Sequence, residues 1–293
     1  MDLKILQDTP PWDWPRGIGQ KFLSILRDPK AKASDRLLAA DLAGDFTVIN
    51  DPLAHALLAI VGNAAEPEEL RAAAAISLGP ALEQADIDEF DDPESVPISE
   101  KTFHKIQQSL RKVYDDSGVP KFVRRRILEA AVRAPEDWHT DAIRSAYASH
   151  DPEWKLTAVF GMRHVRGFDE QIVEALESAD PLIHYEAVCA AGVWEIDAAW
   201  PHVVALLAAP GIDKDLLIAA MQAVAGIRPR EAAALLVHLA HSEDEDIADA
   251  ADEAMAEAEG LSDHELEDDD EFAGEDDDDD DEDDEEENDE TIH

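Results

Sequence analysis

The sequence is short of several residue types, and each shortage excludes a class of protein. A single cysteine, Cys189, rules out a disulfide within the chain. Aromatic residues make up only 6% of the 293 residues, so we expect no large aromatic-lined cavity. No run of 18 apolar residues occurs, and the N-terminus lacks a long apolar core and a cleavage-site pattern. We therefore expect a soluble, cytoplasmic protein with no membrane partner.

Basic residues are also scarce, and this argues against a nucleic-acid partner. The chain has 24 Lys and Arg against 69 Asp and Glu, for a net charge of −45. Residues 263–290 contain 22 of these acids among 28 positions, which leaves −23 for residues 1–262. Affinity for nucleic acid depends on Lys and Arg that neutralise phosphates, and an acidic body supplies too few.

The Asp/Glu-rich C-terminal stretch forms a segment of its own. A block of like charge cannot bury enough apolar surface to fold alone, so residues 263–293 are predicted to be a disordered tail. Such a tail attracts a basic protein partner over a long range, or it only keeps the chain soluble. Adaptation to high salt is a third explanation, but it does not require the acids to be concentrated at one end.

What the sequence does contain is a repeat. Residues 180–192 begin with Asp-Pro, continue as an Ala-rich apolar run and end in Gly, which indicates one short, tightly packed helix. A similar pattern begins at Asp151-Pro152, 29 positions earlier, and residues 216–221 match residues 183–188 at a distance of 33. A period near 30 is typical of a solenoid, so the predicted fold is all-α.

The repeat divides the chain into about seven helix pairs. Residues 1–15 form a lead-in, residues 16–262 the solenoid, and the acidic stretch 83–100 a loop inserted in it. The expected pairs are 16–28 with 35–44, 52–62 with 67–82, 98–114 with 122–132, 138–148 with 152–164, 168–176 with 181–193, 200–207 with 214–225, and 230–241 with 246–258.

The second helices share an apolar residue followed by a basic one, as in Leu70-Arg71, Val123-Arg124, Trp154-Lys155 and Ile183-His184. With the Asp-Pro starts and Ala-rich second helices, this pattern resembles HEAT repeats over residues 16–258, especially the short bacterial subtype also found in phycobilisome lyases. The resemblance implies a right-handed α-solenoid, with the repeat's Arg bonded to a neighbouring turn. The match weakens at the ends, where terminal repeats must face water.

One segment of this acidic chain is strongly basic. Residues 101–133 carry nine bases against three acids, a net charge of +6. We interpret it as a surface for an acidic partner, or as the place where the chain's own tail docks; the alternative is a solvated charged face. Arg124 matches the repeat's internal Arg and is expected to be structural. The candidate partner-binding residues are Arg111, Lys112, Lys121, Arg125 and Arg126.

Trp194 joins these candidates because it follows a helix end, and Trp is favoured at protein-binding hot spots. Trp154 is expected in the core. With a concave solenoid face and an acidic tail, the leading function is a non-catalytic scaffold that binds a basic protein. The alternative is a bilin lyase-like or other modifying enzyme, which the repeat resemblance implies and its fold alone does not establish.

No catalytic, cofactor-binding or metal-binding residue is assigned. Deoxyhypusine hydroxylase resembles this architecture but needs paired His-Glu dipeptides, and here only His264-Glu265 occurs. Helical-repeat DNA glycosylases need a basic groove, which the acidic body makes improbable. His238 and His241 share a helix spacing but lack a full ligand set. Phosphate-binding loops and nucleophile motifs are absent.

Overall fold

The computed structural model describes residues 3–90 and 96–272, and these residues form helices and no strand. The helices are α1 (Lys4–Gln7), η1 (Pro11–Asp13), α2 (Ile18–Arg27), α3 (Ala33–Leu42), α4 (Asp51–Val61), α5 (Glu68–Ile76), α6 (Gly79–Ile87), α7 (Glu100–Asp115), α8 (Lys121–Ala131), α9 (Asp137–Tyr147), α10 (Pro152–Met162), α11 (Asp169–Ala175), α12 (Pro181–Val193), η2 (Asp197–Ala199), α13 (Trp200–Leu207), α14 (Lys214–Ile227), α15 (Pro229–Leu236), η3 (Leu239–His241) and α16 (Glu245–Phe272).

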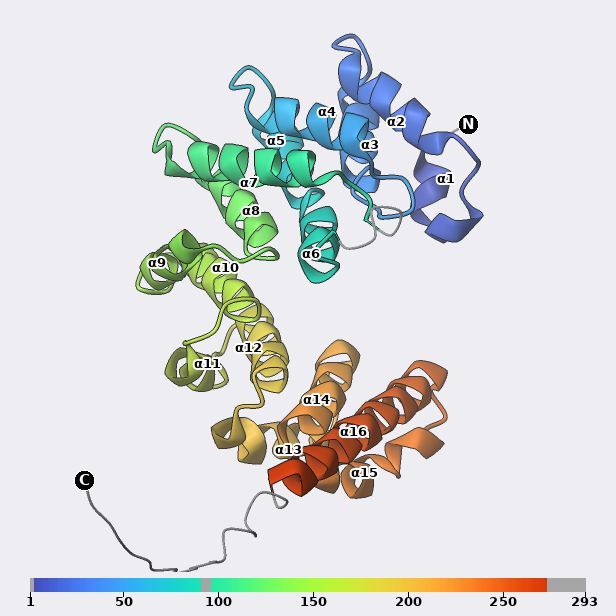
Figure 1. Cartoon of the computed structure of the whole chain (residues 1–293), viewed down its shortest axis with the longest axis vertical. Helices are drawn as coiled ribbons and strands as arrows, with labels where there is room; N and C mark the ends of the chain where they lie inside the picture. Colours follow the sequence, from blue (N-terminus) through green and yellow to red (C-terminus); the bar gives the residue numbers. More distant parts are fainter. Residues whose placement is uncertain (1–2, 91–95, 273–293) are drawn as a thin grey trace, which may run out of the picture.

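Successive helices pack in pairs, and the second members of the pairs pack in one continuous series. α2 packs on α3, α4 on α5, α7 on α8, α9 on α10, α11 on α12, α13 on α14 and α15 on α16. Each of α3, α5, α8, α10, α12, α14 and α16 contacts the next in that order. The series curves, so the N-terminal helices lie above and α13–α16 below in Figure 1. The all-helical prediction is confirmed, and the arrangement is consistent with an α-solenoid.

The Asp-Pro pattern begins helices as the sequence predicts. Asp151 and Asp180 precede the prolines that open α10 and α12, and each side chain accepts hydrogen bonds from the first turn. The Asp180 carboxylate accepts from the Leu182 N–H at 2.9 Å. Proline suits this position because its missing N–H would have no helical partner there. These caps position the second helices, which form the inner series.

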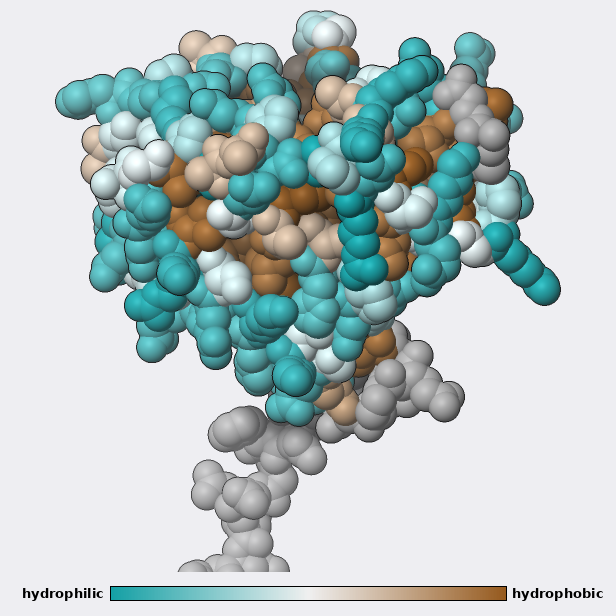
Figure 2. All heavy atoms as spheres, turned by 90° about the horizontal axis from the view of Figure 1, so that it is seen from above, coloured by the Kyte–Doolittle hydropathy of each residue, from teal (hydrophilic) through white to brown (hydrophobic). Residues whose placement is uncertain are grey.

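Both helices of each pair contribute to the core, and the second helices contribute many buried alanines. Gly192 of α12 lies against Ala223 of α14, and a Cβ added at Gly192 would stand 2.7 Å from the Ala223 Cα. Small residues therefore set the spacing of these two helices. Seen from above in Figure 2, hydrophilic side chains form most of the visible surface, with apolar groups in the hollow between them.

Gly192→Ala is expected to lower the free energy of unfolding by about 1–3 kcal/mol, because the added methyl group forces α12 and α14 apart. Gly260→Ala in α16 is the matched control. A Cβ there meets nothing within 4 Å, so the better helix propensity of alanine should leave stability equal or slightly higher. Urea denaturation measures both. Equal effects of the two substitutions would contradict the close approach.

The segment after α5 differs from the prediction of one helix over 67–82 followed by a loop over 83–100. The helix breaks at Ser77 and Leu78, and α6 then continues to Ile87, with Ala85 fully buried. Pro80 explains the break, because its nitrogen cannot donate to the carbonyl of Ile76. Residues 83–87 are therefore helix rather than loop, and residues 91–95 lie outside the described residues.

The predicted lead-in at residues 1–15 packs on the first pair. Leu3 and Leu6 are buried, and the Trp14 indole N–H donates to the carbonyl of Thr9 at 2.8 Å. The Trp14 ring meets Phe22 edge to face, with centroids 5.8 Å apart. These contacts cover the apolar end of the helix stack.

At the other end, the backbone of α16 runs to Phe272, past residue 262 where the tail was expected to begin. Residues 273–293, most of the predicted acidic tail, lie outside the described residues. In the described part of the chain, no helix has the length and apolar character needed to cross a membrane.

Candidate partner-binding surfaces

The basic segment 101–133 covers α7 and α8. The basic side chains of these two helices differ in their exposure and in whether they pair with other groups of the protein. The side chains of Lys101, Lys105, Arg111 and Lys112 on α7 are exposed. Within the described residues, none of these four forms a hydrogen bond or ion pair through its side chain. The bases of α8 are engaged with carboxylates or carbonyls of the protein itself. The unpaired positive charge therefore belongs to α7.

Arg125 is buried between α8 and α10, with 6% of its surface exposed. Its Nε donates to Thr157 Oγ1 at 2.9 Å, and its Nη1 lies 3.0 Å from Glu153 Oε1. The Thr157 hydroxyl donates to Glu129 Oε1 at 2.6 Å, which completes a buried polar network. A buried guanidinium needs this compensation. The prediction that Arg125 is available to a partner is wrong.

Two other candidates on α8 are matched to carboxylates but stay partly exposed. Arg126 Nη1 lies 2.5 Å from Glu129 Oε2. Lys121 Nζ lies 2.8 Å from Asp151 Oδ2 and also contacts Glu153. The hydrogen bond to Asp151 raises the pKa of Lys121, so this amine stays charged. Both charges are offset locally, which weakens the case for a partner surface on α8.

The lysine contact at Lys121 recurs later in the chain. Lys214, the first residue of α14, lies 2.7 Å from Asp244 Oδ1 and also contacts Asp246. In both cases the lysine opens one second helix and reaches the start of the next second helix. The spacing of 30 and 32 residues shows that this bridge is a feature of the repeat.

Trp194 is half-buried rather than exposed. Its indole N–H donates to the carbonyl of Met162 at 2.6 Å, and the Arg166 guanidinium stands 4.7 Å from the ring centroid. The indole thus joins the end of α12 to the end of α10. The expectation of an exposed side chain is corrected, because an orphaned carbonyl at the end of α10 needs a donor.

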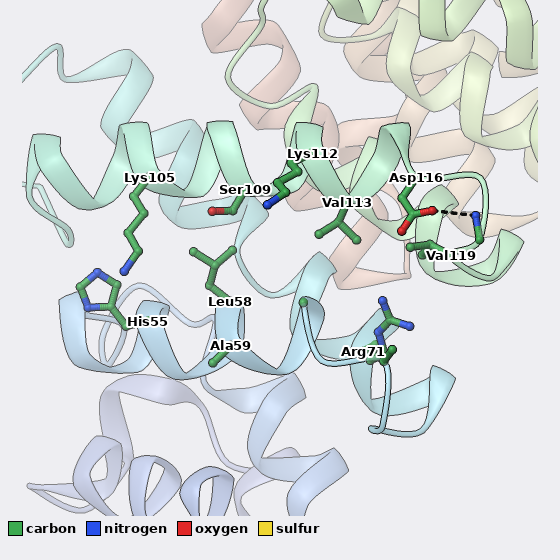
Figure 3. A pocket seen from close by; sticks show the side chains of 13 residues that line it. His55, Leu58, Ala59, Arg71, Lys105, Ser109, Lys112, Val113, Asp116 and Val119 are labelled. Atoms are coloured by element: carbon green, nitrogen blue, oxygen red, sulfur yellow. Dashed lines mark hydrogen bonds between the residues drawn. The ribbon is translucent and has the colours of Figure 1, made fainter.

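A cavity of about 540 Å³ lies between α4, α5 and α7. Four of its lining residues carry nitrogen-containing basic side chains: His55, Arg71, Lys105 and Lys112. In the view of Figure 3, His55 and Lys105 lie at one end of the cavity and Arg71 lies at the other end, below Val119. Of these residues only Lys112 was predicted as a binding residue. His55 carries no motif, and the repeat pattern that contains Arg71 predicts only its bond to a neighbouring turn.

A smaller cavity of about 260 Å³ is lined by α10, α12, α14 and α16, with Arg163, Cys189, Gln222 and Glu257 among its residues. Burial raises the pKa of the Cys189 thiol. A thiol with a raised pKa is a poor nucleophile, because the thiolate is the reactive form. Burial also raises the pKa of Tyr185 to about 12, so its phenol stays protonated. This cavity offers polar contacts without an activated nucleophile.

No cluster of three or more His, Cys, Asp or Glu residues able to hold a metal ion occurs in the described part of the chain. His238 and His241, the pair singled out from the sequence, are both exposed. A closer pair was missed: the Nε2 atoms of His184 and His202 lie 2.8 Å apart, from α12 and α13. Their separation of 18 residues gives no motif that could have revealed them.

One exposed face of α16 is strongly acidic. Asp249, Asp252, Glu253, Glu257 and Glu259 are exposed, and none pairs with another residue that the structure describes. The opposite face buries alanines against α14 and α15. No Lys or Arg follows position 230 in the sequence. The acidic face of α16 therefore leads directly into the Asp/Glu-rich segment.

Comparison with family models and with curated proteins gives no match. Among solved structures, the chain is similar to human deoxyhypusine hydroxylase in complex with glycerol. The two are 16% identical over 83% of this chain and 96% of the other, with a TM-score of 0.37.

Proposed function

We propose that this chain is a non-catalytic scaffold, a right-handed HEAT-like solenoid of about seven helix pairs, that binds a basic protein partner. The observation that supports it most is the acidic face of α16, where five exposed carboxylates have no partner among the described residues. In sequence this face continues into 22 acids. Together they form a long-range attractor for a positively charged protein.

The alternative is a bilin lyase-like or other modifying enzyme, with the cavity beside Cys189 as its site. Convergent polar groups at Arg163, Gln222 and Glu257 favour this idea. The raised pKa of the Cys189 thiol opposes it, because covalent attachment to sulfur requires a thiolate. We therefore prefer the scaffold.

A charge-neutralised α16 tests the proposal. The variant carries Asp249→Asn, Asp252→Asn and Glu253→Gln, and the control carries Glu68→Gln and Glu69→Gln on the exposed start of α5. Each full-length protein is used to capture partners, which are identified by mass spectrometry. We expect one basic protein to bind the wild type and the control, with roughly tenfold weaker binding to the α16 variant.

The wild-type complex is also expected to weaken between about 0.05 M and about 0.3 M salt, because screening shortens the reach of the carboxylates. A partner that binds the α16 variant as tightly as the wild type would contradict the proposal. A partner of acidic composition would contradict it too.

A further inference from the structure

Three arginines hold the same position in three successive second helices. Arg36, Arg71 and Arg124 each stand four residues after the residue that caps their helix. Each donates to a carbonyl ten residues earlier: Arg36 Nη2 to Leu26 at 3.3 Å, Arg71 Nε to Val61 at 2.9 Å, and Arg124 Nε to Tyr114 at 2.8 Å. We name this the arginine tie. The repeat resemblance implied it for Arg124.

The three arginines differ in the other contacts that their guanidinium groups make. Arg36 is paired in a bidentate manner with Glu66, at 2.6 and 2.8 Å. The Arg124 guanidinium stands 4.9 Å from the ring centroid of Tyr114 and 5.7 Å from that of Trp154. Arg71 is only 4% exposed, and its terminal nitrogens have no hydrogen bond or ion pair with any described residue. It lines the cavity of about 540 Å³ instead.

The repeat explains why the Arg71 partner is missing. Glu66 immediately precedes Pro67, the cap of α5, and Val119 immediately precedes Pro120, the cap of α8. Val119 therefore occupies the position relative to Arg71 that Glu66 occupies relative to Arg36. Figure 3 shows the Arg71 guanidinium directed toward the Val119 loop across the cavity. A bidentate oxyanion would fit this place, as Glu66 does beside Arg36.

The other cavity groups have the matching charge. Lys105 and Lys112 lie on the opposite wall, and neither forms an ion pair with a described residue. The one carboxylate among the lining residues, Asp116, accepts a hydrogen bond from the Gly118 N–H at 2.8 Å. Leu58 and Val113 give the cavity apolar walls, which strengthen an ion pair by excluding water.

We propose that this cavity binds an oxyanion, a carboxylate or phosphate group, which Arg71 grips in a bidentate manner and which the positive charges of Lys105 and Lys112 along the same cavity attract. This site is independent of the scaffold function and of the acidic face of α16. The group comes from a free small anion or from an Asp or Glu side chain of the chain's own acidic tail. Both sources present the same chemistry to Arg71.

The decisive variant is Val119→Glu, which supplies to Arg71 the carboxylate that Glu66 supplies to Arg36. Binding of inorganic phosphate and of citrate to the full-length protein is followed through the Arg71 Nε–H signal by NMR. We expect saturable binding to the wild type and at least tenfold weaker binding to Val119→Glu. The neutral control Val119→Gln should bind like the wild type, and Lys105→Gln with Lys112→Gln should weaken binding severalfold.

Asp116→Asn checks the competing carboxylate and should strengthen binding, because it removes a negative charge from the cavity. The proposal is overturned if neither anion saturates and tail neutralisation, described below, leaves the Arg71 signal unmoved. It is equally overturned if Val119→Glu binds phosphate as tightly as Val119→Gln. None of these substitutions alters the arginine tie, so a folded protein is expected throughout.

A full-length variant with Asn in place of the six Asp residues at 276–281 separates the two sources. If the tail supplies the carboxylate, this variant shifts the Arg71 signal before any anion is added and binds phosphate more tightly than the wild type. If the ligand is a free anion, the signal stays in place and phosphate binding is unchanged. Either result supports an oxyanion site at Arg71.

Discussion

Arg125→Met is expected to lower the free energy of unfolding by about 3 kcal/mol, because it breaks a buried ion pair and leaves Glu129 with one counter-ion fewer. The substitution leaves Glu129 buried, 5% exposed, with Arg126 as its remaining counter-ion. It also removes the donor to Thr157. Chemical denaturation of the wild type and the variant measures the loss. Replacing Arg125 with Glu would destabilise the fold for the same reason, so its effect would not report on docking of the tail.

A rescue variant separates lost charge pairing from lost packing. Arg125→Met combined with Glu129→Met removes both buried charges and should recover about half of the lost stability. Arg126→Met serves as the control, because Arg126 is partly exposed and Glu129 keeps Arg125 and the Thr157 hydroxyl, so its loss should cost only about 1–2 kcal/mol. If Arg125→Met cost no more than Arg126→Met, the buried network would not be what holds α8 on α10.

The protein is expected to lose stability as the pH falls from about 6.5 to about 4, because two histidines, one buried and one partly buried, resist protonation in the folded state. Burial lowers the pKa of His139 and of His164 from 6.5 to about 4. Below pH 6.5 the unfolded chain takes up protons that the folded chain refuses. Each histidine therefore contributes about 3 kcal/mol that is present above pH 6.5 and lost toward pH 4.

His139 is the better of the two histidines to test, because its neutral ring makes a defined hydrogen bond. Its Nδ1 accepts from the Glu136 N–H at 2.8 Å at the start of α9, and protonation would remove this acceptor. Between pH 7.5 and 5, His139→Gln should lose about 2 kcal/mol less stability than the wild type. The exposed His238→Gln is the control and should follow the wild type.

Comparison between variants is needed because carboxyl groups also titrate in this range. Burial raises the pKa of Glu186, so this group favours the folded state more at low pH, opposite to the histidines. The difference between His139→Gln and the wild type removes that contribution. If His139→Gln lost as much stability as the wild type between pH 7.5 and 5, His139 would not be the sensor.

The helix pairs could be predicted because their signals are local. Asp-Pro caps, Ala-rich second helices and a period near 30 residues each lie within one repeat, and the described helices follow them. The arginine tie is also local, since it joins residues ten positions apart, and it extends to Arg36, where the sequence match had weakened. The main miss was the break before α6, although Pro80 marked it.

The candidate site was harder to predict because charge pairing across repeats leaves no local trace. Arg125 and Lys121 count as basic residues in the sequence, but their partners lie 28 to 32 positions away. The net charge of residues 101–133 therefore overestimates the positive charge that α8 offers to a partner, and it does not distinguish α8 from α7. For Arg71 the repeat pattern predicts the bond to a neighbouring turn. It does not predict that the terminal guanidinium nitrogens have no partner among the described residues.

Two kinds of polar link stabilise this array of helix pairs, and they act on different terms: some join the two helices of one pair, and others join one pair to the next. The arginine ties of α3, α5 and α8 join the two helices of one pair, so they add to the intrinsic stability of each N-terminal unit. The Lys214 bridge and the Trp194 indole join one pair to the next, so they add to the coupling between units. Weakly stable units with strong coupling unfold as a block, whereas self-stabilised units open singly. Links between pairs occur in both halves, as at Lys121 and Lys214, whereas the arginine ties join the helices of the first three pairs. We therefore expect the intrinsic stability of the units, rather than the coupling between them, to differ along the array.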